Sequence, residues 1–222
     1  QTLQKLKENQ LESGAWPWFK GMYESRYITQ YIVSGLGHLQ KLGIAQADLD
    51  MTQKACAYLD QEIDEDYRDL KKYTVDVSKY SPSYDQIQYL YARSFFKDIE
   101  INPAYQKAAD YFYLQATKNW TSYPPYMQGM IALTSHRKED VAVAKDILKA
   151  LKENAVQSEE LGMYYKANAG YYWHEAQIEK QSLLIEAFEE VGQDEKAVDE
   201  LQIWLLKNKQ TNDWKTTRAT AE

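Results

Sequence analysis

The chain has 222 residues, which is enough to bury one sizeable core, and we expect residues 1–222 to form a single domain. A formal net charge of −7 gives it no electrostatic attraction to nucleic acid or to an anionic membrane surface. No apolar run reaches the roughly 18 residues of a transmembrane helix. The chain begins at Gln1 rather than at a methionine and ends at Glu222 in what reads as an unfinished helix, so we expect a fragment of a larger protein.

Apolar residues that recur every three or four positions predict helices throughout the first half of the chain. The expected helices are residues 1–11, residues 26–42, a helix that follows Asp48, a helix that starts at residues 81–83 and a helix that starts at Asn102 and Pro103. Gly14 and Pro17 break the first helix, and Gly43 is expected to cap the second. In the helix after Asp48, the residues expected on one face are Leu49, Ala55, Leu59 and Ile63.

The second half continues in the same way after a break at residues 123–126. The expected segments are a short apolar helix from Met127, a helix over residues 138–152, an irregular stretch over residues 155–174, a helix from Glu175 to Gly192 and a helix over residues 194–207. No segment alternates between apolar and polar residues with a period of two, so strands are not expected. The predicted fold class is therefore all-α.

A glutamine-to-tryptophan phrase occurs near both ends of this series. Gln10 is followed by a short polar turn and Trp16, and Gln210 is followed by another turn and Trp214, after which a helix is expected to open at Thr216. The same kind of connection between two helices thus occurs twice, which favours stacked antiparallel helix pairs. We expect these pairs to form an incomplete α/α toroid rather than an open superhelix of the tetratricopeptide type, whose ~34-residue pattern is not found.

Three stretches resemble one known family. They are Gly-Ala-Trp-Pro-Trp-Phe at residues 14–19 with the following helix, Gly-Tyr-Tyr-Trp-His-Glu-Ala at residues 170–176, and residues 204–221. Together, in order along nearly the whole chain, they resemble the thioester-domain region of bacterial α-2-macroglobulin-like proteins. The resemblance implies the α/α toroid shared with terpenoid cyclases and protein prenyltransferases. It also implies a very large parent protein, secreted or anchored in the periplasm or cell envelope, that inhibits endopeptidases by trapping them.

The thioester chemistry of that family does not carry over to this chain. The family's thioester joins a cysteine to a glutamine three residues later, ahead of the Gly-x-Trp turn. The only cysteine here, Cys56, lies after that turn, and Leu59 stands where glutamine is needed. Cys56 is therefore interpreted as a small buried core residue. Either a segment upstream of Gln1 carries a Cys-x-x-Gln string, or the parent lacks a thioester; the sequence leaves both open.

Other catalytic interpretations of the sequence have less support than structural interpretations. The string Gln10-x-x-x-Gly14-x-Trp16 also resembles the Gln-Trp repeat of triterpene cyclases, but their Asp-x-Asp-Asp proton donor is absent. Carboxylate pairs could hydrolyse glycosides, and the candidates are Glu159 with Glu160, Glu175 with Glu179, and the run from Glu62 to Asp69. With 33 acidic residues in the chain, such pairs are expected by chance.

Neither a metal nor a cofactor is expected. The three histidines lie far apart in sequence and none stands in a ligand-spaced motif; they are His38, His136 and His174. No catalytic residue is assigned.

Aromatic residues are the one feature that could bind a partner. Nineteen tyrosines and six tryptophans are present, and those that gather in the expected turns are Trp16, Trp18, Phe19, Tyr123, Tyr126, Tyr171, Tyr172 and Trp173. These side chains either seal one end of the toroid and pack on neighbouring domains, or form a contact surface for a protein or carbohydrate.

We therefore expect a non-catalytic structural and interaction domain. Its partners would be other domains of the parent protein and target proteases, not nucleic acid or membrane. The alternative is an α/α-barrel carbohydrate-active enzyme.

Overall fold

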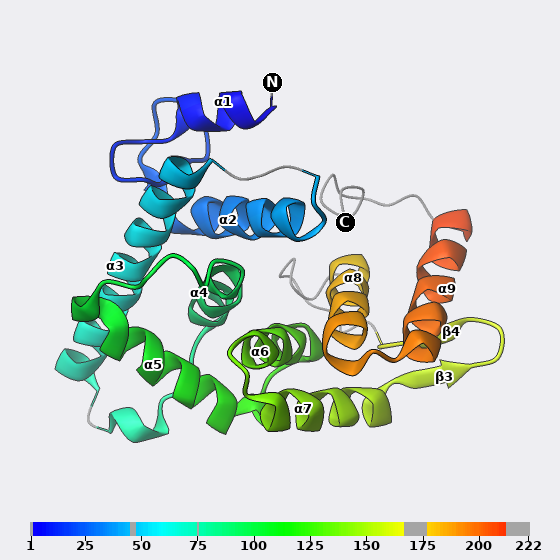
Figure 1. Ribbon diagram of the computed structural model, residues 1–222. Coiled ribbons are helices and arrows are strands. Elements are labelled where there is room, and N and C mark those ends of the chain that lie inside the picture. Colours follow the sequence, from blue (N-terminus) through cyan, green and yellow to red (C-terminus); the bar gives the residue numbers. More distant parts are fainter. Residues whose placement is uncertain (1, 45–47, 75, 167–176, 212–222) are drawn as a thin grey trace. The chain divides into compact units, whose positions relative to one another are not determined.

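The computed structural model describes residues 2–44, 48–74, 76–166 and 177–211 (Figure 1). Within these residues, nine α-helices are joined by short helical turns and two small β-ribbons, so the expected mainly helical character is confirmed. None of the described helices is both long and apolar enough to cross a membrane. The chain divides into two compact units, Gln1–Lys118 and Asn119–Glu222.

The described residues of the first unit form five helices, one 3-10 turn and a two-stranded ribbon. Its elements are α1 (Thr2–Asn9), β1 (Trp16–Pro17), β2 (Glu24–Ser25), α2 (Arg26–Lys41), α3 (Leu49–Tyr73), η1 (Val77–Lys79), α4 (Tyr84–Ser94) and α5 (Pro103–Lys118). Within this unit α2 packs on α4, and α3 packs on α5 (Figure 1). Helices that alternate along the chain are thus neighbours in space.

Side chains that precede three of these helices cap their first turns. Ser25 Oγ accepts a hydrogen bond from the Ile28 amide, and Asp48 Oδ1 accepts one from the Met51 amide. Ser83 opens α4 in a capping box with Gln86. These side chains satisfy amide groups that the first turn of a helix leaves unpaired.

The core of the first unit confirms most of the face expected for α3. Ala55, Leu59 and Ile63 are fully buried, but Leu49 is 64% exposed, so its expected place in the core is wrong. Met51 is buried instead, because it precedes Ala55 by four residues, about one helical turn. Leu49 and Ala55 are six positions apart, and that spacing turns the Leu49 side chain away from the core.

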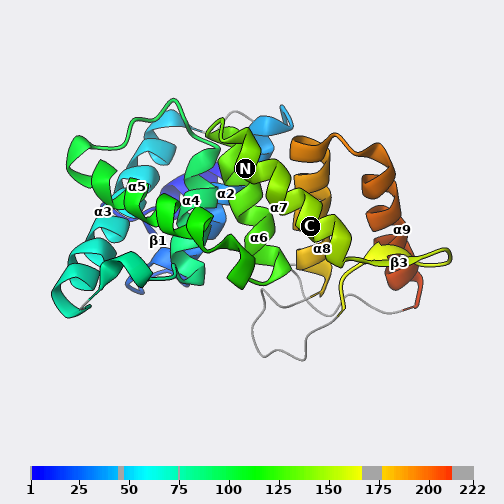
Figure 2. The same ribbon diagram turned by 90° about the horizontal axis from the view of Figure 1, so that it is seen from below.

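In the second unit, the part of the chain that the structure describes contains four α-helices and a second ribbon. Its elements are η2 (Trp120–Ser122), α6 (Pro125–Arg137), α7 (Val141–Asn154), β3 (Val156–Ser158), β4 (Gly162–Tyr164), α8 (Gln177–Ala187), the π-helical turn η4 (Phe188–Gly192) and α9 (Glu195–Thr211). Helix α6 packs on both α7 and α8 (Figure 2), and β4 lies against α9 (Figure 1). Helix α7 begins later than residue 138 because Lys138 caps α6 and Glu139 has a φ of 67°.

The two ribbons correct the expectation that the chain has no strands. β1 pairs with β2, and β3 pairs with β4, both antiparallel. Each strand has only two or three residues, which is too short for a period of two to be read from the sequence. The second ribbon occupies part of the stretch that was expected to be irregular, residues 155–174.

Each ribbon is fixed to a helix by a glycine and a glutamine. Gly14 has a φ of 90° and lies directly against the Lys54 carbonyl of α3, where a Cβ atom would collide. The Gln10 side chain donates to the carbonyl oxygens of Gly14 (2.8 Å) and Met51 (2.9 Å). The glutamine that opens the first repeated phrase therefore ties the turn before β1 to α3.

In the second unit, a glycine and a glutamine also attach the ribbon to a helix, but they stand at different positions relative to the strands. Gly162 has a φ of 73° and lies against the Glu200 carbonyl of α9. Gln181, on α8, donates to the carbonyl oxygens of Met163 (2.7 Å) and Leu201 (3.2 Å). Helix α9 runs on to Thr211, and Trp214 and Thr216 of the second glutamine-to-tryptophan phrase lie outside the described residues.

Candidate functional site

Trp16 is part of the interior rather than of a surface. Its side chain is 2% exposed, its indole nitrogen donates to the Leu6 carbonyl (2.8 Å), and its backbone amide donates to Thr29 Oγ1 (2.9 Å). The indole thereby joins α1 to the ribbon, and the amide joins the ribbon to α2. Trp16 is not available to a partner.

The residues after Trp16 present an exposed aromatic surface. Trp18 is 55% exposed and Phe19 is 72% exposed, at the tip of the first ribbon. Three neighbours that the sequence analysis did not single out extend this surface: Met22, Tyr23, which is 92% exposed, and Tyr31. Trp18, Phe19, Met22, Tyr23 and Tyr31 are called the aromatic surface below.

Local structure holds part of this surface in place. The Trp18 ring stacks on Tyr27, with ring centroids 5.5 Å apart and planes inclined by 11°. The Met22 amide donates to the Phe19 carbonyl (3.1 Å), which closes a tight turn before Tyr23. Tyr31 follows Tyr27 by one turn of α2, so it lies on the same side of the helix. The signal that could have found Met22 and Tyr23 is a pair of large apolar side chains in a turn beside Gly21, where no core position exists.

The other aromatic residues singled out from the sequence do not extend this surface within the described residues. Tyr126 is 3% exposed in α6, and Tyr123 is half-buried just before that helix. Both belong to the second unit, whereas the aromatic surface belongs to the first. The remaining three, Tyr171, Tyr172 and Trp173, lie outside the described residues.

Cys56 is fully buried on the inner face of α3. Burial raises the pKa of its thiol to about 11, so very little thiolate forms near neutral pH. A thioester would need this sulfur to reach a glutamine carbonyl carbon, but the residue three positions later is Leu59, also fully buried.

A buried ion pair lies one helical turn beyond Cys56. Arg93 of α4 donates to Asp60 Oδ1 through Nε (2.9 Å), and the Tyr89 hydroxyl donates to the same oxygen (2.8 Å). Arg93 also donates to the carbonyls of Phe96 and Ile99, which fixes the loop that leads to α5. Burial raises the pKa of Asp60, while Arg93 and Tyr89 oppose that shift. The pair holds α3, α4 and this loop together.

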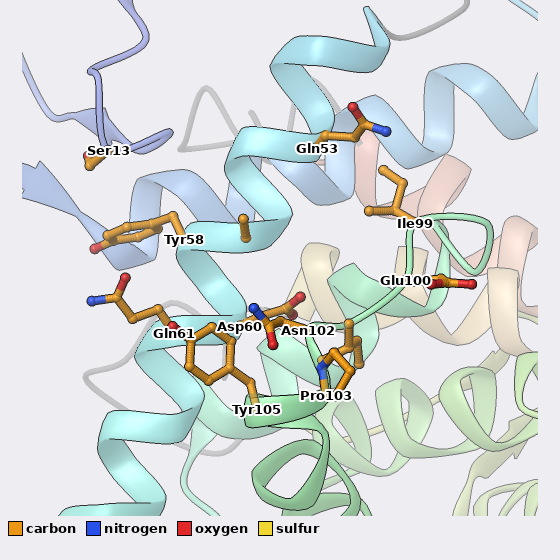
Figure 3. A pocket seen from close by; sticks show the side chains of 12 residues that line it. Ser13, Gln53, Tyr58, Asp60, Gln61, Ile99, Glu100, Asn102, Pro103 and Tyr105 are labelled. Carbon is orange, nitrogen blue, oxygen red and sulfur yellow. The ribbon is translucent and has the colours of Figure 1, made fainter.

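A cavity of about 520 Å³ lies beside Asp60 of this pair (Figure 3). It runs along α3 from Gln53 to Gln61 and is bounded by residues 99–103, by Tyr105 of α5 and by Ser13. The cavity lies entirely in the first unit. Sequence reasoning missed it, although Asp60 gave one signal, since it is a carboxylate on the apolar face that Cys56, Leu59 and Ile63 define.

The other candidate carboxylates are spread over several elements. Glu159 and Glu160 are exposed between β3 and β4, Glu179 is buried in α8, and Glu175 lies outside the described residues. In the run from Glu62 to Asp69, Asp64 pairs with Arg68 (2.9 Å), and Asp66 pairs with Arg26 (2.8 Å). These are ion pairs along or beside α3.

His38 takes part in packing. Its Nε2 atom is 3.0 Å from the Tyr91 hydroxyl, and its ring lies 4.8 Å from that of Phe95. Among the described residues, no three His, Cys, Asp or Glu side chains are placed to hold a metal ion.

Comparison with known proteins adds no identification. No model of a protein family matches this chain, and no curated protein is significantly similar to it. The resemblance to bacterial α-2-macroglobulin-like proteins therefore rests on the residues quoted for it.

Proposed function

We propose that this chain is a non-catalytic structural and interaction domain of an α-2-macroglobulin-like, protease-trapping protein. In this proposal the domain carries no thioester of its own, and it contacts neighbouring domains of the parent through the aromatic surface. The location that goes with the proposal is the periplasm or cell envelope.

The aromatic surface is the observation that carries the proposal. From their exposed fractions, its five side chains leave roughly 600 Å² of mainly apolar area open to water. A standard interface covers about 800 Å² on each partner. Exposed apolar patches of this size mark interaction sites on soluble proteins, and aromatic side chains supply much of the binding energy at interfaces.

The packing of alternate helices supports the α/α toroid as the finer form of the fold. In the first unit α2 packs on α4 and α3 packs on α5, and in the second α6 packs on α8. A toroid of helix pairs is built from two such layers. The environment of Cys56 supports the absence of thioester chemistry in this chain, because the thiol is buried and its pKa is raised.

Binding to the flanking regions of the parent, supplied as separate chains, tests the interaction. Isothermal titration calorimetry should show association, and Phe19→Ala with Tyr23→Ala should weaken it at least tenfold, as the loss of a central aromatic contact does. Leu114→Ala is the matched control, since Leu114 is exposed on α5 away from this surface. Equal weakening by the control, or no association at all, would refute the proposal.

Chemical inertness is tested separately. Incubation with methylamine should leave the intact mass unchanged, and incubation with oligosaccharides should release no new reducing ends. A stoichiometric amine adduct would show that Cys56 is activated. Hydrolysis would favour the carbohydrate-active enzyme.

A further inference from the structure

The cavity beside α3 is lined by polar groups that have no partner among the residues that the structure describes. Among the described residues, the hydroxyls of Tyr58 and Tyr105 and the side chains of Gln53 and Glu100 make no hydrogen bond or ion pair. Figure 3 shows from which elements these side chains come, namely α3, the loop before α5 and α5 itself. Both hydrogen-bond donors and acceptors are thus left over at this site.

Two further side chains at the cavity add one hydrogen-bond donor and one hydrogen-bond acceptor. Asn102 uses its oxygen to cap α5 by accepting from the Ala104 amide (3.0 Å), which leaves its NH₂ group as a donor. Gln61 uses its NH₂ group to donate to Glu65 (3.1 Å), which leaves its oxygen as an acceptor. A ligand that matches this lining must itself both donate and accept at several positions.

The charges at the cavity exclude an anionic ligand. No lysine, arginine or histidine of the described residues lines it, and Asp60, which does line it, is already paired with Arg93. Burial raises the pKa of Tyr58, and Glu62 adds to that shift, so its hydroxyl remains a donor at physiological pH. A purely apolar ligand would leave the unpaired groups without partners, at a cost in free energy for each.

The remaining wall is apolar and partly aromatic. Ile99, Ile101 and Pro103 line it together with the rings of Tyr58 and Tyr105. The face of a sugar ring is apolar and its edge carries hydroxyls, so aromatic rings and unpaired amides suit it at the same time. A volume of about 520 Å³ lies within the range of small-molecule sites.

We propose that this cavity binds a neutral, polyhydroxylated ligand of mono- or disaccharide size, without cleaving it. The Gln53, Gln61 and Asn102 amides and the Tyr105 hydroxyl would hydrogen-bond the hydroxyls, and the Tyr rings would contact the apolar face. This site is separate from the aromatic surface, so the proposal of sugar binding is independent of the interaction proposed above.

Saturation-transfer difference NMR on the whole chain tests this site, with cellobiose, maltose and N,N′-diacetylchitobiose as probes. At least one probe should bind with a dissociation constant in the millimolar range or below. Gln53→Ala and Tyr105→Phe should each raise that constant by about threefold to tenfold, the effect of losing one hydrogen bond. Neither change removes a hydrogen bond within the protein, so both variants should fold.

Matched controls carry the same substitutions elsewhere. Gln202→Ala, on the exposed side of α9, and Tyr73→Phe, at the exposed end of α3, should leave binding unchanged. Three results would overturn the proposal: no binding of any probe, binding that Trp18→Ala abolishes while the cavity variants retain it, or binding of choline in place of the sugars. Release of new reducing ends would contradict binding without cleavage.

Discussion

The indole of Trp18 lies stacked on the ring of Tyr27, 5.5 Å between centroids, while more than half of the Trp18 surface stays open to water. One face of the ring is thus held by the first turn of α2 and the rest is presented outward. A side chain fixed in this way loses little conformational entropy when a partner covers it. Trp16, two residues earlier, is buried and joins α1 to the ribbon. The phrase Trp-Pro-Trp therefore combines a core residue with a surface residue.

The two ribbon glycines should be intolerant of any side chain. Gly14→Ala and Gly162→Ala place a Cβ atom against a helix carbonyl at a positive φ, so each should reduce the free energy of unfolding by more than about 1 kcal/mol. Gly35→Ala is the contrasting control, because Gly35 is exposed inside α2 with open space around its Cα atom. That change should stabilise the chain by about 1 kcal/mol. Urea denaturation measures all three; the same sign for Gly14 and Gly35 would show that the ribbon is not fixed to α3 as described.

The buried ion pair should respond much more strongly to mutation than an exposed one. Arg93→Ala leaves the Asp60 carboxylate buried without its cation, and it should cost about 3–5 kcal/mol. Arg68→Ala, which removes an exposed pair on the same helix α3, should cost less than about 1 kcal/mol. A similar effect of both changes on the urea midpoint would mean that Asp60 and Arg93 are solvated.

Cys56 should be inert in the folded chain and reactive after unfolding. With a pKa of about 11, its thiol carries at pH 8 roughly a few hundredfold less thiolate than an ordinary cysteine, in addition to being inaccessible. Iodoacetamide should label it only when urea is added, as mass spectrometry can show. Rapid labelling of the folded chain would contradict the burial of this residue.

The raised pKa of the Cys56 thiol also predicts how the free energy of unfolding changes at high pH. The folded state holds the thiol proton more tightly than the unfolded state, whose pKa is about 8.5. The stabilisation is therefore complete below that value and is lost as the pH rises to about 11. The Cys56→Ser variant lacks this thiol, so its free energy of unfolding would not fall for this reason. The difference in free energy of unfolding between the unchanged chain and the variant should therefore shrink as the pH rises from about 8.5 to about 11.

The sequence predicted the helices well because their boundaries depend on local chemistry. Ser25, Asp48 and Ser83 cap the helices they precede, and the spacing of Ala55, Leu59 and Ile63 places them in the core. The expected position of Leu49 was wrong because a residue near the start of a helix can fit an apolar pattern loosely and still point outward.

The ribbons and the cavity could not be predicted in the same way. The ribbon attachments join residues distant in sequence, such as Gln181 with Met163 and Leu201, and no local pattern encodes such contacts. The cavity is lined by α3 and by the loop before α5, so its lining depends on how these segments pack together. Aromatic residues in turns were a useful signal, but burial decided which of them are on the surface: Trp18 and Phe19 are, and Trp16 and Tyr126 are not.

The central claim is that the aromatic surface is covered by other domains of a larger parent protein. Hydroxyl-radical footprinting of Phe19, Met22 and Tyr23, in the isolated chain and in the full-length protein, tests it most directly. We predict that oxidation of these three residues falls severalfold in the full-length protein, while that of Tyr73, exposed at the end of α3, stays the same. Equal oxidation of Phe19, Met22 and Tyr23 in both proteins would show that nothing covers this surface, and would contradict its role as an interaction site within the parent.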